Sequence, residues 1–273
     1  MRIEKILLTT NQVFKIKKFR SGTHCNAERS ELLFKMKLLY TATTEYEIFG
    51  MRILNLLVEN FPQTFFVGGM PRDLLLGRQV EDMDIATVAS PKEVTKILQT
   101  NGIKPNLNNS EFGVVSAVQG NHVVEIATFR TDIYRTNRYP KVKFVTTAEE
   151  DALRRDFTIN ALYFQPHTQI VQDFFSGIED LKTHSIKFIG EPGVRIQEDP
   201  LRILRALRFA LVLDCTLEAN TYAGIENNFP SVIKISESRK KTELEKISDK
   251  KNKIILEKVI NKPDDLDKYF KKS

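Results

Sequence analysis

The 273-residue sequence predicts an α+β fold in which a small mixed β-sheet with helices is followed by a helical region. Short apolar runs at residues 65–67 and 83–88 are separated by helical patterns, which is typical of a sheet with helices packed on it. The segments 113–118 and 122–127 are β-rich and flank a Gln-Gly-Asn turn, so they predict a hairpin. From residue 149 onward, helical spacing of apolar residues dominates.

The helices of the first half have recognisable limits in the sequence. Apolar residues recur at helical spacing over residues 45–59, which predicts a helix that Pro62 ends. The strand at 65–67 runs directly into two glycines, and Pro71 then suits the first turn of a short helix. A further helix is predicted to follow Ser90.

Charge and cysteine content limit the classes of function. Lys and Arg outnumber Asp and Glu nine to three in residues 1–40 and thirteen to eight in residues 231–273, so the middle of the chain is acidic. This distribution suits a carboxylate site flanked by surfaces for a polyanion, and a basic surface without a partner fits equally well. Cys25 and Cys215 are too few for a disulfide framework or a zinc site, and no apolar run is long enough to cross a membrane. We expect a cytoplasmic protein, with organellar targeting by residues 1–30 as the alternative.

Two aspartates, Asp82 and Asp84, are the strongest candidates for chemistry. Residues i and i+2 of a strand project from one face, so the two carboxylates are expected side by side. Carboxylates that hold two divalent metals suit the in-line attack of a hydroxyl on an α-phosphate. Glu125, in the apolar run 123–127, is the candidate third carboxylate. The plainer alternatives are an acidic strand end at the surface and an outward-facing Glu125.

A phosphate-binding turn is predicted just before this pair. Gly68 and Gly69 lie between a strand and a helix, where glycine allows close backbone approach and the first helical N–H groups bind phosphate oxygens. Arg72 supplies a cation beside them. The turn and the carboxylates together favour a nucleotide site over an acidic surface strand.

A second polar cluster lies at residues 154–160. Asp156 and Asn160 are spaced i, i+4, which would place them on one face of a helix, where they could hold a ribose or order the site. Arg155 can reach a phosphate. A solvated surface ion pair is the alternative interpretation.

The third cluster begins at Asp199, where Pro200 suits the first turn of a helix with arginines at every third position, Arg202, Arg205 and Arg208. Asp199 and Arg202 offer an acceptor and a donor to the edge of a base. Cytosine and adenine both carry an exocyclic amine beside an unprotonated ring nitrogen, whereas uracil and guanine carry the opposite pattern. The pair therefore predicts that the protein itself selects C and A. The alternative is that Asp199 only caps its helix.

Five stretches in this order resemble the motifs of the class II tRNA nucleotidyltransferase and bacterial poly(A) polymerase family, which is part of the polymerase β superfamily. They are GGMPRDLLLGRQVEDMDIAT, ALRRDFTINALYF, DFFSGIEDL, EDPLRILRALRF and the weaker SESRKKTELEKI. The resemblance covers residues 65–247, and the five stretches are highly specific in combination. Pro71 stands where the family usually has an aliphatic residue, which the start of a helix tolerates.

The resemblance implies an activity and a set of site residues. The activity is the addition of CMP and AMP to the 3′ end of tRNA without a nucleic-acid template, with CTP and ATP as substrates and two Mg²⁺ ions bound by Asp82 and Asp84. Triphosphate contacts are implied at Gly69 and Arg72. Further nucleotide contacts are implied at Arg155, Asp156, Asn160, Asp199, Arg202, Arg205 and Arg208, of which Asp156 and Asn160 resemble the ribose-side residues.

The same resemblance implies four segments along the chain. Residues 1–44 would be a basic extension, disordered or used for targeting, and residues 45–160 the catalytic nucleotidyltransferase head. Residues 161–250 would be a helical neck that selects the nucleotide, and residues 251–273 a charged helix at the start of a truncated body. Family members usually continue into body and tail domains that grip tRNA, so we expect a truncated, split or compact protein with weak tRNA binding.

Two features bear on which nucleotides are added. Residues 130–143 correspond to the flexible loop whose absence marks family members that stop at CC, so their presence favours CCA or A addition. The basic motif that usually marks poly(A) polymerases is not evident around residues 126–130. The alternatives are therefore poly(A) or A-only addition, and a non-catalytic RNA-binding remnant or one half of a split enzyme.

Overall fold

The computed structural model describes residues 34–133 and 141–271, which divide into two compact units. Among the described residues, the first unit contains 34–133, 141–154 and 160–176, and the second contains 155–159 and 177–271. Most of the expected N-terminal extension and the centre of the expected flexible loop lie outside the described residues.

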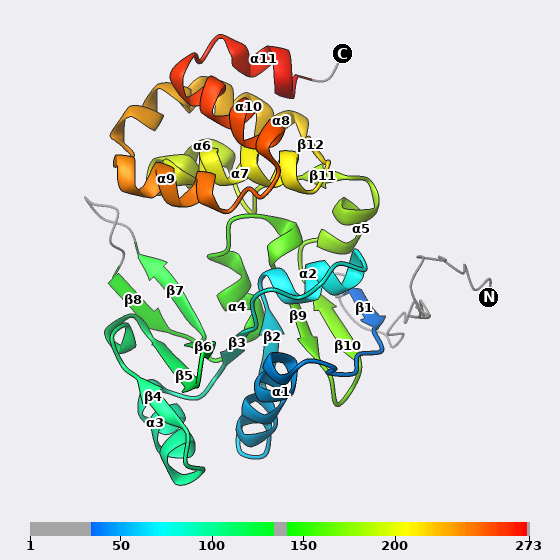
Figure 1. Cartoon of the computed structure of the whole chain (residues 1–273), viewed down its shortest axis with the longest axis vertical. Coiled ribbons are helices and arrows are strands. Elements are labelled where there is room, and N and C mark those ends of the chain that lie inside the picture. Colours follow the sequence, from blue (N-terminus) through cyan, green and yellow to red (C-terminus); the bar gives the residue numbers. More distant parts are fainter. Residues whose placement is uncertain (1–33, 134–140, 272–273) are drawn as a thin grey trace, which may run out of the picture. The chain divides into compact units, whose positions relative to one another are not determined.

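A mixed sheet forms the centre of the first unit. In the described part of the chain it has eight strands in the order β1-β10-β9-β2-β3-β6-β5-β4 (Figure 1). Neighbours run antiparallel except β3 and β6, which pair in parallel. The strands are β1 (Phe34–Lys37), β2 (Thr64–Val67), β3 (Asp84–Thr87), β4 (Lys104–Asn106), β5 (Val114–Gln119), β6 (His122–Thr128), β9 (Leu162–Gln165) and β10 (Ile170–Asp173). The predicted α+β class is confirmed.

The two longer helices of this unit begin at capping boxes. The Thr44 hydroxyl accepts the N–H of Glu47, and the Glu47 carboxylate accepts the N–H of Thr44; Ser90 and Glu93 are arranged in the same way. Each box satisfies backbone donors that a helix start otherwise leaves unpaired. The first of these helices packs on β2 and β6. The remaining elements of the unit are α1 (Glu45–Val58), α2 (Gly69–Leu75), α3 (Pro91–Thr100), the 3₁₀ helix η1 (Ser110–Phe112), the ribbon β7 (Arg130–Ile133) with β8 (Lys141–Phe144), and α4 (Ala148–Leu153).

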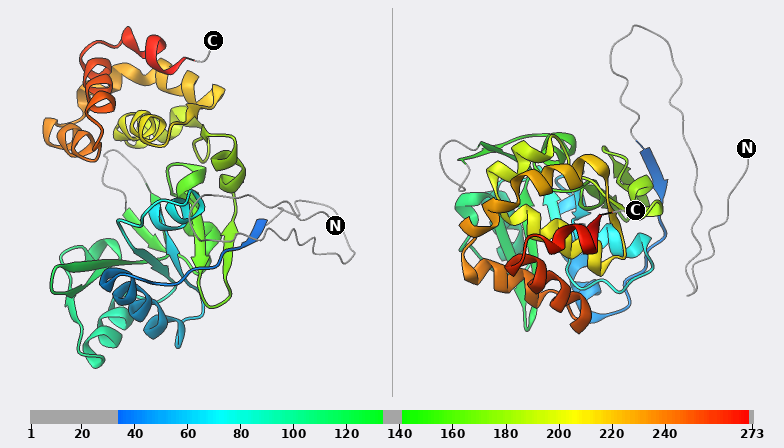
Figure 2. Two further views of the ribbon diagram at one scale, coloured as in Figure 1. Left: turned by 45° about the vertical axis from the view of Figure 1, so that its right-hand side comes forward. Right: turned by 90° about the horizontal axis from the view of Figure 1, so that it is seen from above.

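The second unit is mainly helical, with the central helix α7 contacting α6, α9 and α10 (Figure 2). A close approach between two helices requires glycine, because a Cβ at Gly224 would lie 2.4 Å from Cβ of Pro192. No helix in the described ranges is both long and apolar enough to cross a bilayer. The elements are α5 (Gly177–Lys182), β11 (Ser185–Ile186), α6 (Pro192–Glu198), α7 (Leu201–Val212), β12 (Thr216–Leu217), α8 (Ala219–Asn228), η3 (Phe229–Lys234), α9 (Glu237–Glu245), α10 (Lys250–Asn261) and α11 (Asp265–Phe270); η2 (Thr158–Asn160) lies at the junction of the units.

The sheet extends beyond the limits that the sequence predicts. Helical spacing favours helices from residue 149 onward, but β9 and β10 form a hairpin within that stretch and belong to the first unit. Three of the four residues of β9 are buried, so the strand shows no alternation of polar and apolar residues in the sequence. Likewise β1, which the sequence places in the N-terminal extension, pairs with β10 (Figure 1).

The C-terminal helices pack within the second unit. For residues 239–272 the sequence predicts Lys- and Glu-rich helix without a strong apolar face, which either needs a partner to pack against or frays. In the structure α10 buries Leu256 and Val259 and contacts α7, where the Asn252 side chain donates to the Leu211 carbonyl at 3.1 Å. A narrow apolar stripe is sufficient here because it meets another helix within the same unit.

A buried carboxylate, that of Asp151 in α4, joins three elements of the first unit. The hydroxyl of Tyr163, in β9, donates to its Oδ2 atom at 2.6 Å. Its Oδ1 atom accepts the backbone N–H of Arg130, in β7, at 3.1 Å and Nε of Arg154 at 2.8 Å. The Asp151 side chain has no exposed surface, so its carboxylate depends on these donors.

We predict that Asp151→Ala lowers the free energy of unfolding by about 3–5 kcal/mol, because it removes the buried acceptor of a buried hydroxyl, a part-buried guanidinium and a part-buried backbone N–H. The control is Glu149→Ala, which removes an exposed acid from the same helix and should change stability by less than about 1 kcal/mol. Chemical denaturation monitored by circular dichroism measures both. Equal effects of the two variants would contradict a structural role for Asp151.

Candidate active site

The aspartate pair lies where the chain enters β3. Asp84 is the first residue of the strand, and Asp82 precedes it by two positions. The side chain between them, Met83, is 1% exposed, whereas Asp82 is exposed and Asp84 half-buried. The acids on either side of the buried methionine thus keep exposed surface. Because β3 begins only at Asp84, the side-by-side placement of the two carboxylates stays a prediction.

Glu125 lies beside this pair in the sheet. The parallel pairing of β3 with β6 puts Asp84 and Glu125 at the same register position, so their side chains project from the same face of neighbouring strands. Glu125 is exposed, while Val124 and Ile126 on either side are buried. Within residues 34–133 and 141–271, no three acidic, His or Cys side chains gather closely enough to form a metal cluster. The metal role of Glu125 stays a prediction, whereas its outward-facing position is observed.

The two glycines form the turn from β2 into α2. Gly68 has a positive φ of 71°, a backbone conformation that side chains rarely adopt, and α2 begins at Gly69. A Cβ at position 69 would lie 3.3 Å from Nη2 of Arg72, so glycine leaves room for the guanidinium.

The Arg72 guanidinium is held in place on three sides. Its Nε and Nη2 atoms donate to the two carboxylate oxygens of Asp73, at 3.0 and 2.8 Å. Its Nη1 atom donates to Oδ1 of Asn160 at 2.7 Å. Arg72 is therefore a preoriented cation beside the glycine turn, and Asp73, which the sequence analysis missed, is a residue that orients it.

The second sequence cluster does not form the predicted helical face. Helix α4 ends at Leu153, and the chain passes from one unit to the other between Arg154 and Asn160. Asn160 belongs to the first unit and binds Arg72, whereas Asp156 belongs to the second, where its Oδ2 atom accepts Nε of Arg205 at 2.6 Å. The i, i+4 interpretation is wrong because that spacing has meaning only inside a helix.

The third sequence cluster lies in the second unit with its polar groups engaged. Asp199 accepts two hydrogen bonds from the Arg239 guanidinium, at 3.1 and 2.7 Å, and a third from the backbone N–H of Leu201 at 3.1 Å. Arg202 is 7% exposed and donates from Nη1 to Oε2 of Glu198 at 2.6 Å. Asp199 therefore satisfies a donor at the start of α7, although the N-cap itself is Pro200, and is also part of an ion pair.

Arg195 supports the same region from α6. Its Nη1 atom donates to Glu198 at 2.7 Å, its carbonyl accepts Nη1 of Arg202 at 2.9 Å, and its Nη2 atom donates to the carbonyl of Arg155 at 2.9 Å. No pattern in the sequence selects Arg195, whereas Arg239 lies in the fifth motif stretch. The network places Arg155 near the α6–α7 junction within the second unit.

The last two arginines of α7 converge on one acid of α9. Arg208 donates from Nε to Oε2 of Glu243 at 2.7 Å, and Nη1 of Arg205 lies 3.8 Å from its other oxygen. Burial by itself raises the pKa of Glu243, but the charges of Arg208 and then Arg205 offset it, so this pKa lies below its ordinary value. Arg208 also covers the ring of Phe209 at 4.1 Å from the ring centroid.

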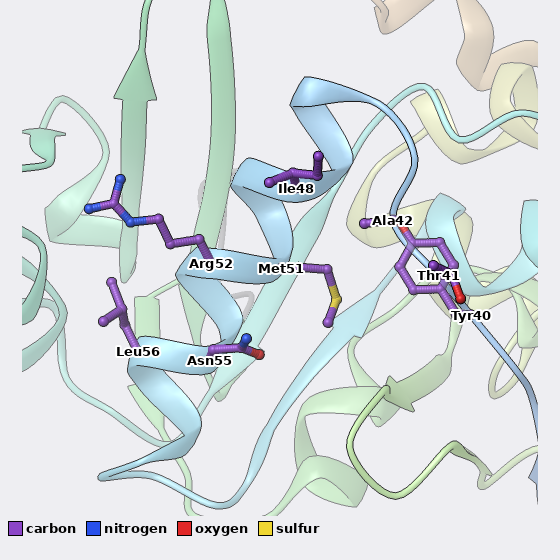
Figure 3. Close-up of a pocket in the computed structure, with 8 residues that line it drawn as sticks. All are labelled: Tyr40, Thr41, Ala42, Ile48, Met51, Arg52, Asn55 and Leu56. Carbon is purple, nitrogen blue, oxygen red and sulfur yellow. The ribbon is translucent and has the colours of Figure 1, made fainter.

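A groove elsewhere on the first unit has no part in this site. It has a volume of about 570 Å³ and follows the exposed side of α1 (Figure 3). It is lined by Tyr40, Thr41, Ala42, Ile48, Met51, Arg52, Asn55 and Leu56. None of the predicted site residues lies among them.

Residues 64–187 match the poly A polymerase head domain, which bears out the resemblance of the motifs for this segment. Among curated relatives, the CCA-adding enzyme of Lactobacillus helveticus is 44% identical over 199 residues, which are 72% of this chain and 49% of the relative. The CCA-adding enzyme of Streptococcus pyogenes serotype M2 is 40% identical over 77% of this chain and 51% of its own. The chain thus spans about half the length of the curated relatives it matches.

Solved structures agree with these relatives. The CCA-adding enzyme of Bacillus stearothermophilus in complex with CTP is 36% identical, with a TM-score of 0.66 over 75% of this chain and 49% of that one. A tRNA nucleotidyltransferase complexed with a primer tRNA and an incoming ATP analog is 27% identical, with a TM-score of 0.61 over 80% of this chain and 62% of that one. The family is a nucleotidyltransferase family and is generally metal-dependent.

We predict a pH-dependent contribution of Glu243 to the stability of the second unit. Because its pKa is lowered in the folded protein, the contribution is present above the ordinary pKa of 4.5 and is lost as the pH falls through the folded value. Glu243→Gln should therefore cost about 1–3 kcal/mol at pH 7 and progressively less below pH ~4.5. Unfolding of wild type and variant across this pH range measures the difference. A constant difference would contradict the ion-pair assignment.

Proposed function

We propose that this chain adds CMP and AMP to the 3′ end of tRNA without a nucleic-acid template. The observation that carries the proposal is the outward-facing pair Asp82 and Asp84 at the start of β3, within a head domain whose relatives are CCA-adding enzymes. The nucleotides would come from CTP and ATP. Because those relatives are bacterial, we also propose a cytoplasmic location.

The acidic residues suit Mg²⁺, which takes oxygen ligands. Asp82 and Asp84 would hold two ions, with Glu125 at the neighbouring register position as the third carboxylate. The ions would make the tRNA 3′ hydroxyl a better nucleophile and neutralise charge that develops on the phosphates. Without cations the adjacent carboxylates repel one another, which also favours metal binding.

The rest of the head would bind the triphosphate. The Gly68–Gly69 turn exposes backbone next to the Arg72 guanidinium, whose orientation Asp73 and Asn160 fix. A cation held in place before substrate arrives stabilises the leaving pyrophosphate without the cost of reorganisation. Arg72 would therefore act in the transfer step through its charge, and Asn160 through Arg72.

The second unit would select the base, as a neck domain. A carboxylate has about four acceptor positions, so Asp199 can keep its bonds to Arg239 and Leu201 and still accept an exocyclic amine. Arg202, fixed by Glu198, would donate to the unprotonated ring nitrogen of cytosine or adenine. Arg155, Arg205 and Arg208 would contribute positive potential for the phosphates, and Asp156 would orient Arg205.

The decisive experiment offers tRNA ending at the discriminator base, at C or at CC together with each labelled NTP. CCA addition predicts C, C and A in turn, whereas A-only or poly(A) addition predicts AMP on the CC substrate alone or without limit. No incorporation on any substrate would favour a non-catalytic remnant or one half of a split enzyme.

We predict that Asp82→Ala or Asp84→Ala abolishes incorporation while the fold remains intact, because each removes a metal ligand and relieves repulsion in the metal-free site. The control is Glu81→Ala, an exposed acid next to the pair, which should retain activity. Thermal unfolding with and without magnesium plus CTP gives a second measurement. Equal stabilisation of wild type and both variants would refute the assignment of the pair as metal ligands.

We predict that Asp199→Ala lowers the ratio of kcat/KM for CTP over UTP by roughly tenfold to a hundredfold, because a buried hydrogen bond to the base is worth about 1–3 kcal/mol. Asp199→Asn is the matched variant, since its amide keeps an acceptor for Leu201 and adds a donor that suits the uracil carbonyl. Both ratios are measured on tRNA ending at the discriminator base. An unchanged ratio in active variants would mean that Asp199 serves only the start of α7.

A further inference from the structure

One tyrosine of α1 reaches the peptide between the two candidate metal ligands. The hydroxyl of Tyr46 accepts the backbone N–H of Met83 at 2.8 Å and lies 3.2 Å from the carbonyl of Val123, to which it donates. Met83 stands between Asp82 and Asp84, and Val123 lies two positions before Glu125 in β6. A single side chain therefore ties α1 to both acidic segments.

The same helix also holds the Met83 side chain. Gly50 lies one turn after Tyr46, at the i+4 position on the same face of α1. A Cβ at position 50 would lie 2.5 Å from Sδ of Met83, so a larger residue there would have to displace the end of this buried side chain. Met83 is thus fixed at its backbone by Tyr46 and at its side chain by Gly50.

The surroundings of Tyr46 favour the protonated hydroxyl, which can donate to the Val123 carbonyl. Burial raises the pKa of Tyr46, and the charges of Asp82, Asp84 and Glu125 raise it further, although the bond from Met83 opposes them. The ring stacks on His122, with 5.5 Å between centroids and 27° between planes. The ring is therefore supported while its hydroxyl faces the acidic segments.

Residues 81–83 have no regular secondary structure of their own, so the direction of the Asp82 carboxylate depends on contacts made by neighbouring elements. We propose that Tyr46 is a positioning residue for the metal-binding pair Asp82 and Asp84, an inference that rests on the proposed function. It lies in α1, which precedes the matched head-domain segment at residues 64–187. Its hydroxyl fixes the peptide between the two aspartates, and Gly50 acts on the same residue through its side chain.

The test compares two Tyr→Phe substitutions. Tyr46→Phe removes the hydroxyl that binds Met83, whereas Tyr40→Phe removes one from the segment before α1, which lines the groove beside that helix (Figure 3). We expect Tyr46→Phe to lower kcat about tenfold or more with the KM for CTP changed less than about twofold, since the proposed triphosphate and base contacts remain. The Mg²⁺ concentration for half-maximal rate should rise as well. Tyr40→Phe should match the wild type in all three values.

A binding measurement separates this inference from the proposed function. Mn²⁺ is titrated into the protein without nucleotide or RNA, and free Mn²⁺ is followed by electron paramagnetic resonance. We expect Tyr46→Phe to weaken Mn²⁺ binding about tenfold and Tyr40→Phe to leave it unchanged. Weakened binding in a protein that adds no nucleotide would refute the proposed function but support the positioning role. Wild-type Mn²⁺ affinity and kcat in Tyr46→Phe would overturn the inference, and so would a wild type that binds no Mn²⁺.

A second pair of variants reaches Met83 from its side chain. Gly50→Ala should push on the Met83 sulfur and reproduce the Mn²⁺ and kcat defects, and Met83→Val in the same chain should reverse them by removing the atoms that clash. Circular dichroism confirms folding of each variant. If Gly50→Ala binds Mn²⁺ like the wild type, or if the double variant stays defective while folded, α1 does not act through Met83.

Discussion

The burial of Met83 against α1 is the contact on which the candidate catalytic face depends. Met83 is buried between two aspartates that keep exposed surface, and because residues 81–83 have no regular secondary structure, contacts with Met83 set the course of the chain there. The parallel pairing of β3 with β6 then sets Glu125 beside Asp84. Closely spaced carboxylates repel one another, and contacts around them offset this repulsion. These contacts are the sheet ladder, the hydrogen bond of the Tyr46 hydroxyl and the packing of Met83 against Gly50. The acidic face is therefore a product of packing on its opposite side.

The second unit accommodates several arginines in a packed interior, where an unpaired charge would be destabilising. Each arginine of α7 meets an acid: Arg202 meets Glu198, Arg205 meets Asp156, and Arg208 meets Glu243. These pairs are buried or partly buried. In such surroundings, removal of one partner destabilises the fold by more than the intact pair stabilises it. The arrangement fixes the orientation of groups along one helix. Such preorientation is what selection of a base edge by protein side chains requires, because flexible groups would accept more than one hydrogen-bonding pattern.

The length of the chain bears on how these two units could act. The curated relatives that it matches are about twice as long as the aligned region, and the match includes the head-domain segment at residues 64–187. The residues proposed for metal, triphosphate and base binding all lie within the described part of this chain. Nucleotide binding can therefore be measured without any RNA, separately from the affinity for RNA.

The sequence by itself determined the class of fold and the glycine turn, because these rest on local rules such as helical spacing and the conformations open to glycine, and it singled out the aspartate pair as a candidate. Tertiary structure decided the rest. Asp156 and Asn160 are four residues apart, yet the chain leaves its helix at Leu153 and the two residues belong to different units. Strands β9 and β10 have four residues each, and β9 is mostly buried, so their short patterns could not be told from that of a helix. Asp73, Arg195 and Tyr46 were not predicted, because the role of a charged or hydroxyl group depends on the group that it contacts in the folded chain. Contacts between residues far apart in the sequence cannot be read from residue spacing. Only the folded chain brings the hydroxyl of Tyr46 to the peptide of Met83, 37 positions away.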